Sequence, residues 1–440
     1  MTIDPVAIEK RPRSLVHMFL DRVAEAPDED AFYYPVEGGW QESTWSQTHT
    51  LVEGLAAGLL ALGIEPEDRV ALVASTRYEA VLGFLATLWA GGAVTAVSPA
   101  ADEETLAALL IDSGARVVIA EDYDTVRRLW RIRGRIRAVA KVVQIDGDYP
   151  DGRVLPLEGL LALGRDHLRQ QPRALSQRLY AVRRHGLASL PYVTGEGGRR
   201  GVRLSHAALT YHATALAALG RLTDADLLYL PLPLTSVYAQ SVLGVQLVSG
   251  FPVALEGRAD QVTDSVAVVR PTVVAATPSL LQDVRTAVED EQPRGLLRRQ
   301  KALDKRMRSE VRSAFGDRLR FVVCAGGDVD SGLADFFEEA GVTVLEAYGR
   351  AETGGAVSVA LPDDAGSRTA GLPLPGTHVR ISAGGEILVA GPGLMDAYHA
   401  RRPVPAKQAE PGWLRTGDAG VLDTEGRLRV LGRYVDRASD

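Results

Sequence analysis

A glycine-rich segment at residues 192–206 has the composition of a phosphate-binding loop. It overlaps the end of an apolar run expected to form a strand, residues 187–193, and leads into an expected helix start at Ser205 and His206. Glycines let the backbone approach an anion and direct several N–H groups at it, and Arg199 and Arg200 add positive charge. Glu196, however, places a carboxylate in the middle of the segment. The segment therefore predicts a degenerate phosphate loop.

Two common phosphate-binding motifs do not fit this segment. A Walker A loop ends in Gly-Lys-Ser/Thr, whereas residues 200–202 are Arg-Gly-Val. The dinucleotide-binding fingerprint requires a third glycine at the position that Arg200 occupies. A different nucleotide site is therefore expected.

The segment resembles the phosphate loop of the adenylate-forming enzymes, the family of acyl-CoA synthetases, luciferases and peptide-synthetase adenylation domains. That loop has the approximate pattern Tyr-Thr-Ser-Gly-Thr-Thr-Gly-x-Pro-Lys-Gly-Val, often followed by Leu-Ser/Thr-His. The matching residues are Tyr192, Thr194, Gly195, Gly201, Val202, Leu204, Ser205 and His206. Further matches follow in the family's order at residues 232–238, 325–327, 348–352, 385–392, 412–418 and 432–433, so the resemblance spans residues 14–436.

On the nucleoside side, the resemblance implies a competent site. Asp418 stands where the family's aspartate binds both ribose hydroxyls, and Arg433 where a basic residue assists. A carboxylate is suited to this role because it can accept two hydrogen bonds from a vicinal diol. The adenylate-binding wall is expected to include Gly326, Gly327, Ala347, Tyr348 and Gly349.

On the phosphate side, the chain departs from the family. The loop, comprising Thr194, Gly195, Glu196, Gly197, Gly198, Arg199, Arg200 and Gly201, is one residue short, which removes up to ~3.5 Å of reach. Ala351 replaces a threonine of the Tyr-Gly-x-Thr-Glu motif, and the Thr-Thr pair of the loop is lost. The Glu196 carboxylate at ~4 Å from one phosphate charge would cost about 4 kcal/mol at an effective dielectric near 20. Arg199 and Arg200 offset part of this repulsion without restoring the lost hydroxyls.

These departures should weaken the binding of ATP more than that of an acyl-adenylate, because the phosphate of the adenylate carries a single negative charge. Adenylation requires a triphosphate, Mg²⁺ and stabilisation of a pentavalent phosphorus, whereas thioester formation requires only the mixed anhydride and a thiol. The sequence therefore predicts an acyl-CoA ligase that transfers the acyl group of acyl-AMP to coenzyme A, with weak or no adenylation. A separate adenylating enzyme would supply the intermediate. The pattern is similar to that of the non-adenylating acyl-CoA ligases of platensimycin-type diterpenoid biosynthesis, which implies a bulky, hydrophobic acid.

Three residues have roles implied by the resemblance alone. Ser236 replaces a histidine that gates the acyl tunnel of many fatty acyl members, and Tyr238 stands where an aromatic residue is usual. Glu352 aligns with the family's Mg²⁺-binding glutamate. Two alternatives stay open: a conventional synthetase that uses ATP and Mg²⁺ for both half-reactions, and an inactive relative that serves as a binding or regulatory subunit. The acceptor could equally be the pantetheine of a carrier protein.

The composition is that of a large soluble enzyme: 440 residues, 46% of them apolar and 24% charged. The single cysteine, Cys324, favours a reducing compartment and a buried structural role. The N-terminus lacks the apolar core of a signal peptide, and the longest apolar run, residues 81–97, is interrupted by glycines, so a cytoplasmic protein without a membrane span is expected. A net charge of −7 gives no reason to expect nucleic acid. Basic stretches at residues 127–137 and 294–320 indicate solvated helix faces, with contacts to coenzyme A phosphates as the alternative.

Short β-branched runs alternate with segments of helix length up to about residue 375, which predicts an α/β fold with mostly parallel sheets. We expect two α/β subdomains over residues 1–375 and, by resemblance, a small β-barrel over residues 376–433 that completes the large domain. Residues 434–440, with Val435 and Asp436, resemble the start of the family's hinge. The resemblance implies that the family's C-terminal small domain is absent from this chain.

Overall fold

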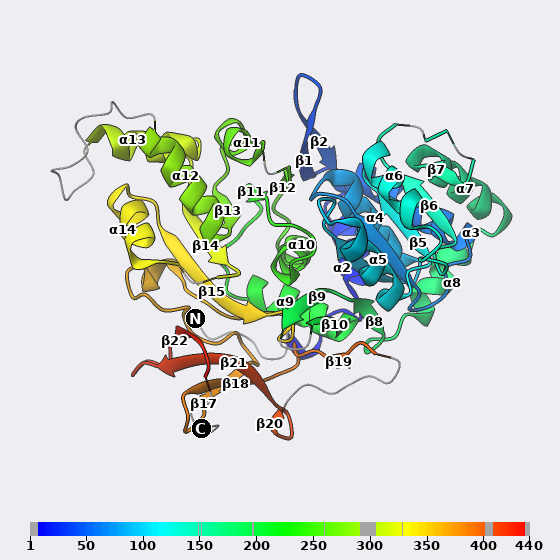
Figure 1. The fold of residues 1–440 in the computed structure, drawn as a ribbon. Coiled ribbons are helices and arrows are strands. Elements are labelled where there is room, and N and C mark those ends of the chain that lie inside the picture. Colours follow the sequence, from blue (N-terminus) through cyan, green and yellow to red (C-terminus); the bar gives the residue numbers. More distant parts are fainter. Residues whose placement is uncertain are drawn as a thin grey trace.

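In the computed structural model, residues 8–147, 149–150, 152–195, 198–258, 260–290, 305–327, 329–400 and 408–435 are described. Three β-sheets organise them (Figure 1). The eight-stranded first sheet has the order β16-β15-β14-β13-β11-β12-β1-β2 and is parallel except for its two outermost pairs. Its strands are β1 (Asp30–Val36), β2 (Gly39–Thr44), β11 (Leu228–Leu230), β12 (Val253–Leu255), β13 (Val273–Ala276), β14 (Phe321–Ala325), β15 (Val344–Arg350) and β16 (Gly355–Val359).

The second sheet has nine strands, in the order β19-β10-β8-β4-β3-β5-β6-β7 with β9 beside β10. Its central part, from β8 to β7, is parallel, whereas β9 and β19 pair with β10 in antiparallel fashion. The strands are β3 (Arg69–Val73), β4 (Ala93–Val97), β5 (Val117–Ala120), β6 (Lys141–Gln144), β7 (Val154–Pro156), β8 (Leu187–Ser189), β9 (Tyr192–Gly195), β10 (Gly198–Ser205) and β19 (Ala397–Tyr398). The strand expected over residues 187–193 is thus divided between β8 and β9.

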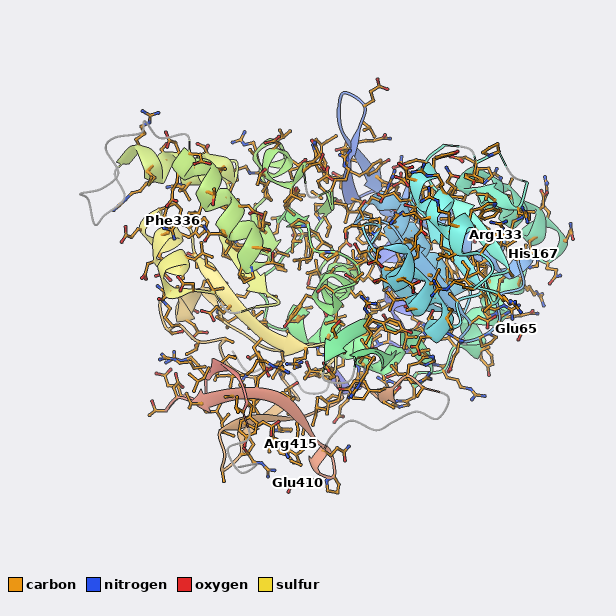
Figure 2. All side chains as sticks on the ribbon, viewed as in Figure 1. Glu65, Arg133, His167, Phe336, Glu410 and Arg415 are labelled. Carbon is orange, nitrogen blue, oxygen red and sulfur yellow. The ribbon has the colours of Figure 1, made fainter. Side chains whose placement is uncertain are left out.

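The third sheet is antiparallel and lies below the other two in the view of Figure 1. It has the order β17-β18-β21-β20, with β22 also paired to β21. Its strands are β17 (His378–Ile381), β18 (Glu386–Ala390), β20 (Gln408–Glu410), β21 (Trp413–Leu422) and β22 (Leu428–Arg433). The pairings among the described residues form one five-stranded sheet, and the small β-barrel expected over residues 376–433 stays a prediction. Figure 2 shows Arg415 and Glu410 on this sheet.

Helices fill the space between and around the two large sheets. One apolar core joins strand residues of the first sheet, such as Phe32 and Val253, to Leu72 and Val117 of the second. The helices are α2 (Leu15–Glu25), α3 (Trp45–Ala61), α4 (Tyr78–Trp89), α5 (Glu103–Ser113), α6 (Tyr123–Ile132), α7 (Leu157–Gln170), α8 (Ala174–Ala181), α9 (His206–Ala217), α10 (Val237–Ser249), α11 (Val262–Val269), α12 (Pro278–Asp290), α13 (Lys305–Ala314) and α14 (Ser331–Glu339), with a short 3₁₀ turn at Pro362–Asp364. In the part of the chain described here, no helix is long and apolar enough to cross a membrane.

The basic stretches form solvated helix faces where they are described. On and just after α6, Arg131 and Arg135 pair with Glu103 and Glu104 of α5. On α13, Met307 and Val311 are buried, although residues 294–304 lie outside the described part. Cys324 is buried in β14, and burial raises the pKa of its thiol to about 12, so its expected structural role is confirmed.

Helix α9 is fixed by two buried histidines. Nε2 of His212 lies 2.9 Å from the carbonyl oxygen of Thr353, in the turn that follows Glu352. Burial lowers the pKa of His212 to about 4 despite its hydrogen bonds to carbonyls. Burial, with a smaller contribution from His17, lowers the pKa of His206 to about 4. Both imidazoles are therefore neutral in the folded protein at neutral pH.

These histidines predict a loss of stability in acid. A histidine in the unfolded chain has a pKa near 6.5, so it becomes protonated below that pH. The two buried histidines of the folded chain become protonated only near pH 4, and the difference favours the unfolded state in acid. The free energy of unfolding should fall by about 2 kcal/mol per histidine between pH 7.5 and pH 5.0. Urea denaturation at the two pH values measures this difference. His212→Gln should reduce the pH dependence, and an unchanged dependence in that variant would contradict the assignment.

Candidate functional site

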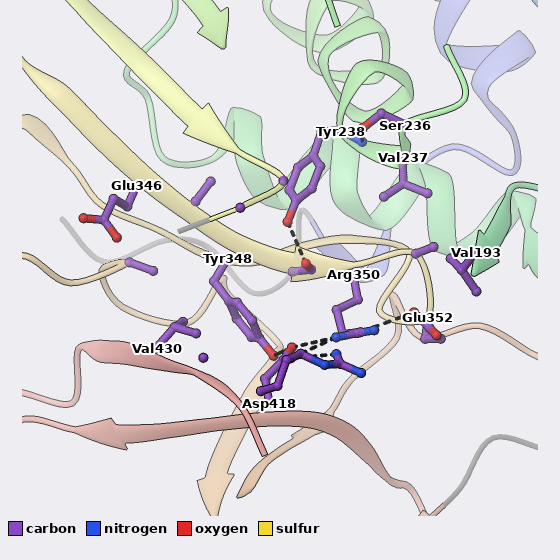
Figure 3. A pocket seen from close by; sticks show the side chains of 18 of the residues that line it. Val193, Ser236, Val237, Tyr238, Glu346, Tyr348, Arg350, Glu352, Asp418 and Val430 are labelled. Carbon is purple, nitrogen blue, oxygen red and sulfur yellow. Dashed lines mark hydrogen bonds and ion pairs between the residues drawn. The ribbon is translucent and has the colours of Figure 1, made fainter. Parts of the chain in front are cut away.

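A cavity of about 470 Å³ opens where the β9–β10 hairpin, the start of α10, β15 and the third sheet converge (Figure 3). The carboxyl end of β14 also reaches it, as expected for a ligand site at the ends of parallel strands. The expected nucleoside-side residues Gly326, Gly327, Ala347, Tyr348, Gly349, Asp418 and Arg433 all line this cavity, together with Ala351, Glu352, Ser236 and Tyr238. Residues from the two ends of the resemblance are thus brought into one site.

Asp418 is the centre of hydrogen bonding in the cavity. It lies on β21 directly opposite Arg433 of β22, and Nη1 of Arg433 is 2.9 Å from Oδ1. The hydroxyl of Tyr348, on β15, donates to Oδ2 at 2.9 Å. The Asp418 carboxylate is 9% exposed, so it is nearly removed from solvent and held by donors from two sheets. This arrangement places a buried, fully hydrogen-bonded carboxylate in the cavity wall.

Arg350 is a cavity residue that the sequence analysis missed. Its Nη1 lies 3.0 Å from Oδ1 and 2.9 Å from Oδ2 of Asp418, and its Nε lies 3.5 Å from Oε2 of Glu352. Burial alone would lower the pKa of Arg350, but the hydrogen bond and charge of Asp418 outweigh burial and raise it. A signal was present in the sequence, because Tyr348 and Arg350 are two residues apart in a strand and share one face. Arg350 was not singled out because it occupies the variable position of the Tyr-Gly-x-Thr-Glu motif.

Glu352 lines the cavity, and its expected metal role stays a prediction. The hydroxyl of Tyr398 donates to its Oε1 at 3.1 Å, and the Arg350 guanidinium faces its Oε2 (Figure 3). Oε2 of Glu352 is buried and has no hydrogen-bond partner in the described part of the chain, because Nε of Arg350 stays 3.5 Å away. Mg²⁺ is commonly bound by one or two carboxylates together with substrate phosphates. Among the described residues, no group of three or more Asp, Glu, His or Cys side chains is placed to hold a metal ion.

The segment expected to be a degenerate phosphate loop pairs as the antiparallel strands β9 and β10, with Arg199 opposite Thr194 and Arg200 opposite Val193. Arg199 donates from Nη2 to the hydroxyl of Thr105 on α5 at 2.9 Å, and the Arg200 guanidinium lies 5.4 Å from the ring centroid of Tyr398. Of the hairpin, Tyr192 and Val193 line the cavity, whereas Thr194, Gly195, Gly198, Arg199, Arg200 and Gly201 are not part of its wall. Glu196 and Gly197 lie outside the described residues.

The start of α10 separates this cavity from a second, apolar one. Ser236 caps the helix by accepting a hydrogen bond from the backbone N–H of Tyr238 at 3.2 Å, and the Tyr238 hydroxyl donates to the carbonyl oxygen of Gly349 at 2.7 Å. Burial raises the pKa of Tyr238, so the phenol stays protonated. Tyr238 and Ala347 line both cavities. The apolar cavity has a volume of about 110 Å³ and a wall made mainly of aliphatic side chains.

Of the expected hinge residues, Val435 is 75% exposed and Asp436 lies outside the described residues.

Comparison with known proteins supports an acyl-CoA ligase relationship. The chain is 29% identical over 455 residues to the long-chain-fatty-acid–CoA ligase FadD15 of Mycobacterium tuberculosis strain H37Rv, covering 94% of this chain and 73% of the relative. It is 27% identical over 406 residues to the 3-[(3aS,4S,7aS)-7a-methyl-1,5-dioxo-octahydro-1H-inden-4-yl]propanoyl:CoA ligase of the same strain, covering 89% of this chain and 74% of the relative.

Solved structures share the fold. The anthranilate CoA ligase AuaEII in complex with anthranoyl-AMP superposes with a TM-score of 0.80 at 18% identity, over 97% of this chain and 79% of that chain. The N-terminal domain of FACL13 from Mycobacterium tuberculosis gives a TM-score of 0.73 at 21% identity, over 96% of this chain and 99% of that chain. The fold is therefore that of the large domain of adenylate-forming enzymes. Residues 19–399 match the family described as AMP-binding enzyme, and the chain belongs to that family.

Proposed function

We propose that the protein binds an acyl-adenylate in the larger cavity and transfers its acyl group to coenzyme A, with weak or no ability to form the adenylate from ATP. The observation that carries this proposal is the contrast within one site. The carboxylate expected to bind ribose is buried and surrounded by donors, whereas the described hairpin arginines contact Thr105 and Tyr398 outside the cavity wall. The cavity is therefore better suited to bind a nucleoside monophosphate than a nucleoside triphosphate.

The transfer of the acyl group to coenzyme A requires few contacts from the phosphate loop. The thiol sulfur of coenzyme A attacks the carbonyl carbon of the mixed anhydride, and the carbon–oxygen bond to AMP breaks. The electron pair leaves with AMP, and the thiol proton passes to solvent. The cavity residues orient the nucleoside, and Tyr238 lies where the acyl group must pass from the nucleotide cavity into the apolar one.

A hydrophobic acid is the proposed substrate, because the second cavity is almost entirely apolar. Its 110 Å³ is well below the roughly 300–1,000 Å³ of sites that enclose drug-sized ligands. A diterpenoid acid, as the resemblance suggests, requires the wall near Tyr238 to open. The diterpenoid assignment and a separate adenylating partner thus stay predictions.

A conventional ATP-dependent synthetase is the second candidate, and the similarity to FadD15 over 94% of the chain favours it. Under this alternative, ATP and Mg²⁺ enter the same cavity and the hairpin moves toward them.

The role of Asp418 is tested with adenosine, which carries the ribose diol without a phosphate. Asp418→Asn removes the charge that strengthens two hydrogen bonds, each worth about 1.5–3 kcal/mol when one partner is charged. Adenosine binding, measured by calorimetry, should weaken by roughly 10- to 100-fold or more. Glu425→Gln, in the exposed turn between β21 and β22, is the matched control and should bind normally. Unchanged binding in Asp418→Asn would remove the diol assignment.

The half-reactions are separated by supplying either acid plus ATP or the synthetic acyl-adenylate, each with coenzyme A and the full-length protein. Adenylates of a straight-chain fatty acid and of a tricyclic diterpenoid acid serve as probes. Thioester is expected from the adenylate and little or none from acid plus ATP. Equal thioester from both would establish the conventional synthetase, and none from any adenylate would leave the inactive relative.

Restoring the family's phosphate donors should restore adenylation. Glu196→Thr and Ala351→Thr, combined with one residue inserted in the loop, reintroduce hydroxyl donors and remove a carboxylate. Pyrophosphate release from acid plus ATP should rise in the full-length protein. A correctly folded variant with no gain would count against the account of the loop.

A further inference from the structure

The Asp418 carboxylate has no spare acceptor capacity for a ribose diol. A carboxylate offers about four lone-pair sites. Tyr348 and Arg433 each donate to one oxygen, and Nη1 of Arg350 contacts both oxygens. A diol that donates two hydrogen bonds to this carboxylate must therefore replace existing contacts. Binding of the diol and rearrangement of the donors around Asp418 must therefore occur together.

Arg350 and Arg433 are the cationic donors that a diol could displace; their side chains are 25% and 67% exposed. Tyr348 is a buried residue of β15, and Arg433 is the direct cross-strand neighbour of Asp418. Arg350 differs from both because it also contacts the second carboxylate of the cavity, Glu352, through Nε. If Nη1 leaves Asp418, Nε still lies 3.5 Å from the Glu352 carboxylate, and the Nη groups can donate to another acceptor in the cavity.

The phosphate of the same nucleotide is a suitable new partner. It is joined to the ribose whose diol displaces Arg350, so it enters the cavity with that diol. The planar guanidinium matches a phosphate in a bidentate geometry. Of the alternatives expected from the sequence, Ala351 has no hydroxyl and Arg199 contacts Thr105. Arg200 lies over the Tyr398 ring rather than in the cavity wall. Within the cavity wall, the described arginines are Arg350 and Arg433.

We propose that Arg350 binds the phosphate of the acyl-adenylate, exchanging its contact with Asp418 for one with the phosphate when the ribose binds. The inference rests on the proposed function for the identity of the ligand. A single positive charge matches the single negative charge of an adenylate phosphate. Arg350 is thus a substrate-positioning residue that discriminates AMP from adenosine.

The test compares AMP with adenosine by calorimetry in the absence of acid, coenzyme A and divalent cations. Arg350→Gln should weaken AMP binding by roughly 10-fold or more, the loss expected for a charge-assisted hydrogen bond. Adenosine binding should be unchanged or tighter, because the diol no longer competes with Arg350 for Asp418. Addition of EDTA should leave AMP binding to the unmodified protein unchanged. Arg380→Gln, an exposed cation on β17 outside the cavity, controls for the loss of one charge.

Three results would overturn the proposal: equal losses for AMP and adenosine, unchanged AMP binding, or AMP binding that depends on Mg²⁺. Arg350→Lys keeps the charge and decides the matter if Arg350→Gln does not fold. Retained discrimination between AMP and adenosine supports the proposal, and its loss contradicts it. Because neither acid nor thiol is present, the result is independent of thioester formation. If Arg350 behaves as expected while no adenylate yields thioester, the proposed function fails and the phosphate contact stands.

Discussion

The site depends on one buried carboxylate that is shared among donors from two sheets. Asp418 belongs to the third sheet, as does Arg433, whereas Tyr348 and Arg350 come from β15 of the first. A carboxylate in this position is costly to bury unless its oxygens are hydrogen-bonded. The same contacts that satisfy it therefore hold the third sheet against the first and form the wall of the cavity. Under the proposed function, the carboxylate oxygens of Asp418 take part both in nucleoside binding and in the contact between the two sheets.

A chain of polar contacts extends from this carboxylate toward the hairpin. Arg350 connects Asp418 to Glu352, Tyr398 donates to Glu352, and the Arg200 guanidinium lies over the Tyr398 ring. The charges along this chain alternate, so each is offset by its neighbour. Arg350 thus lies beside both carboxylates of this chain of contacts.

The sequence predicted much of the fold because local patterns decided it. Buried strands such as β3 and β4 are continuous apolar runs, and they form where the pattern placed them. The residues expected to form the nucleoside wall all line one cavity, because their motifs keep their order and type. The sequence does not decide whether the third sheet closes into a barrel, since closure depends on pairing between strand edges far apart in the chain. Arg350 was missed because a variable motif position reveals nothing about the carboxylate that folding brings to it, and the directions of Arg199 and Arg200 depend on hairpin pairing that composition does not specify.

The antiparallel register of β9 and β10 has a consequence for how this loop can change. Side chains alternate between the two faces of a strand, so a shift by one residue exchanges the faces of Arg199 and Arg200. An insertion confined to the turn between the strands preserves the register and lengthens only the tip. An insertion within β10 instead moves the side chains that lie between the inserted residue and the part of β10 paired with β8 to the opposite face of the strand. A single residue added within β10 would therefore change the direction of a guanidinium as well as the length of the hairpin.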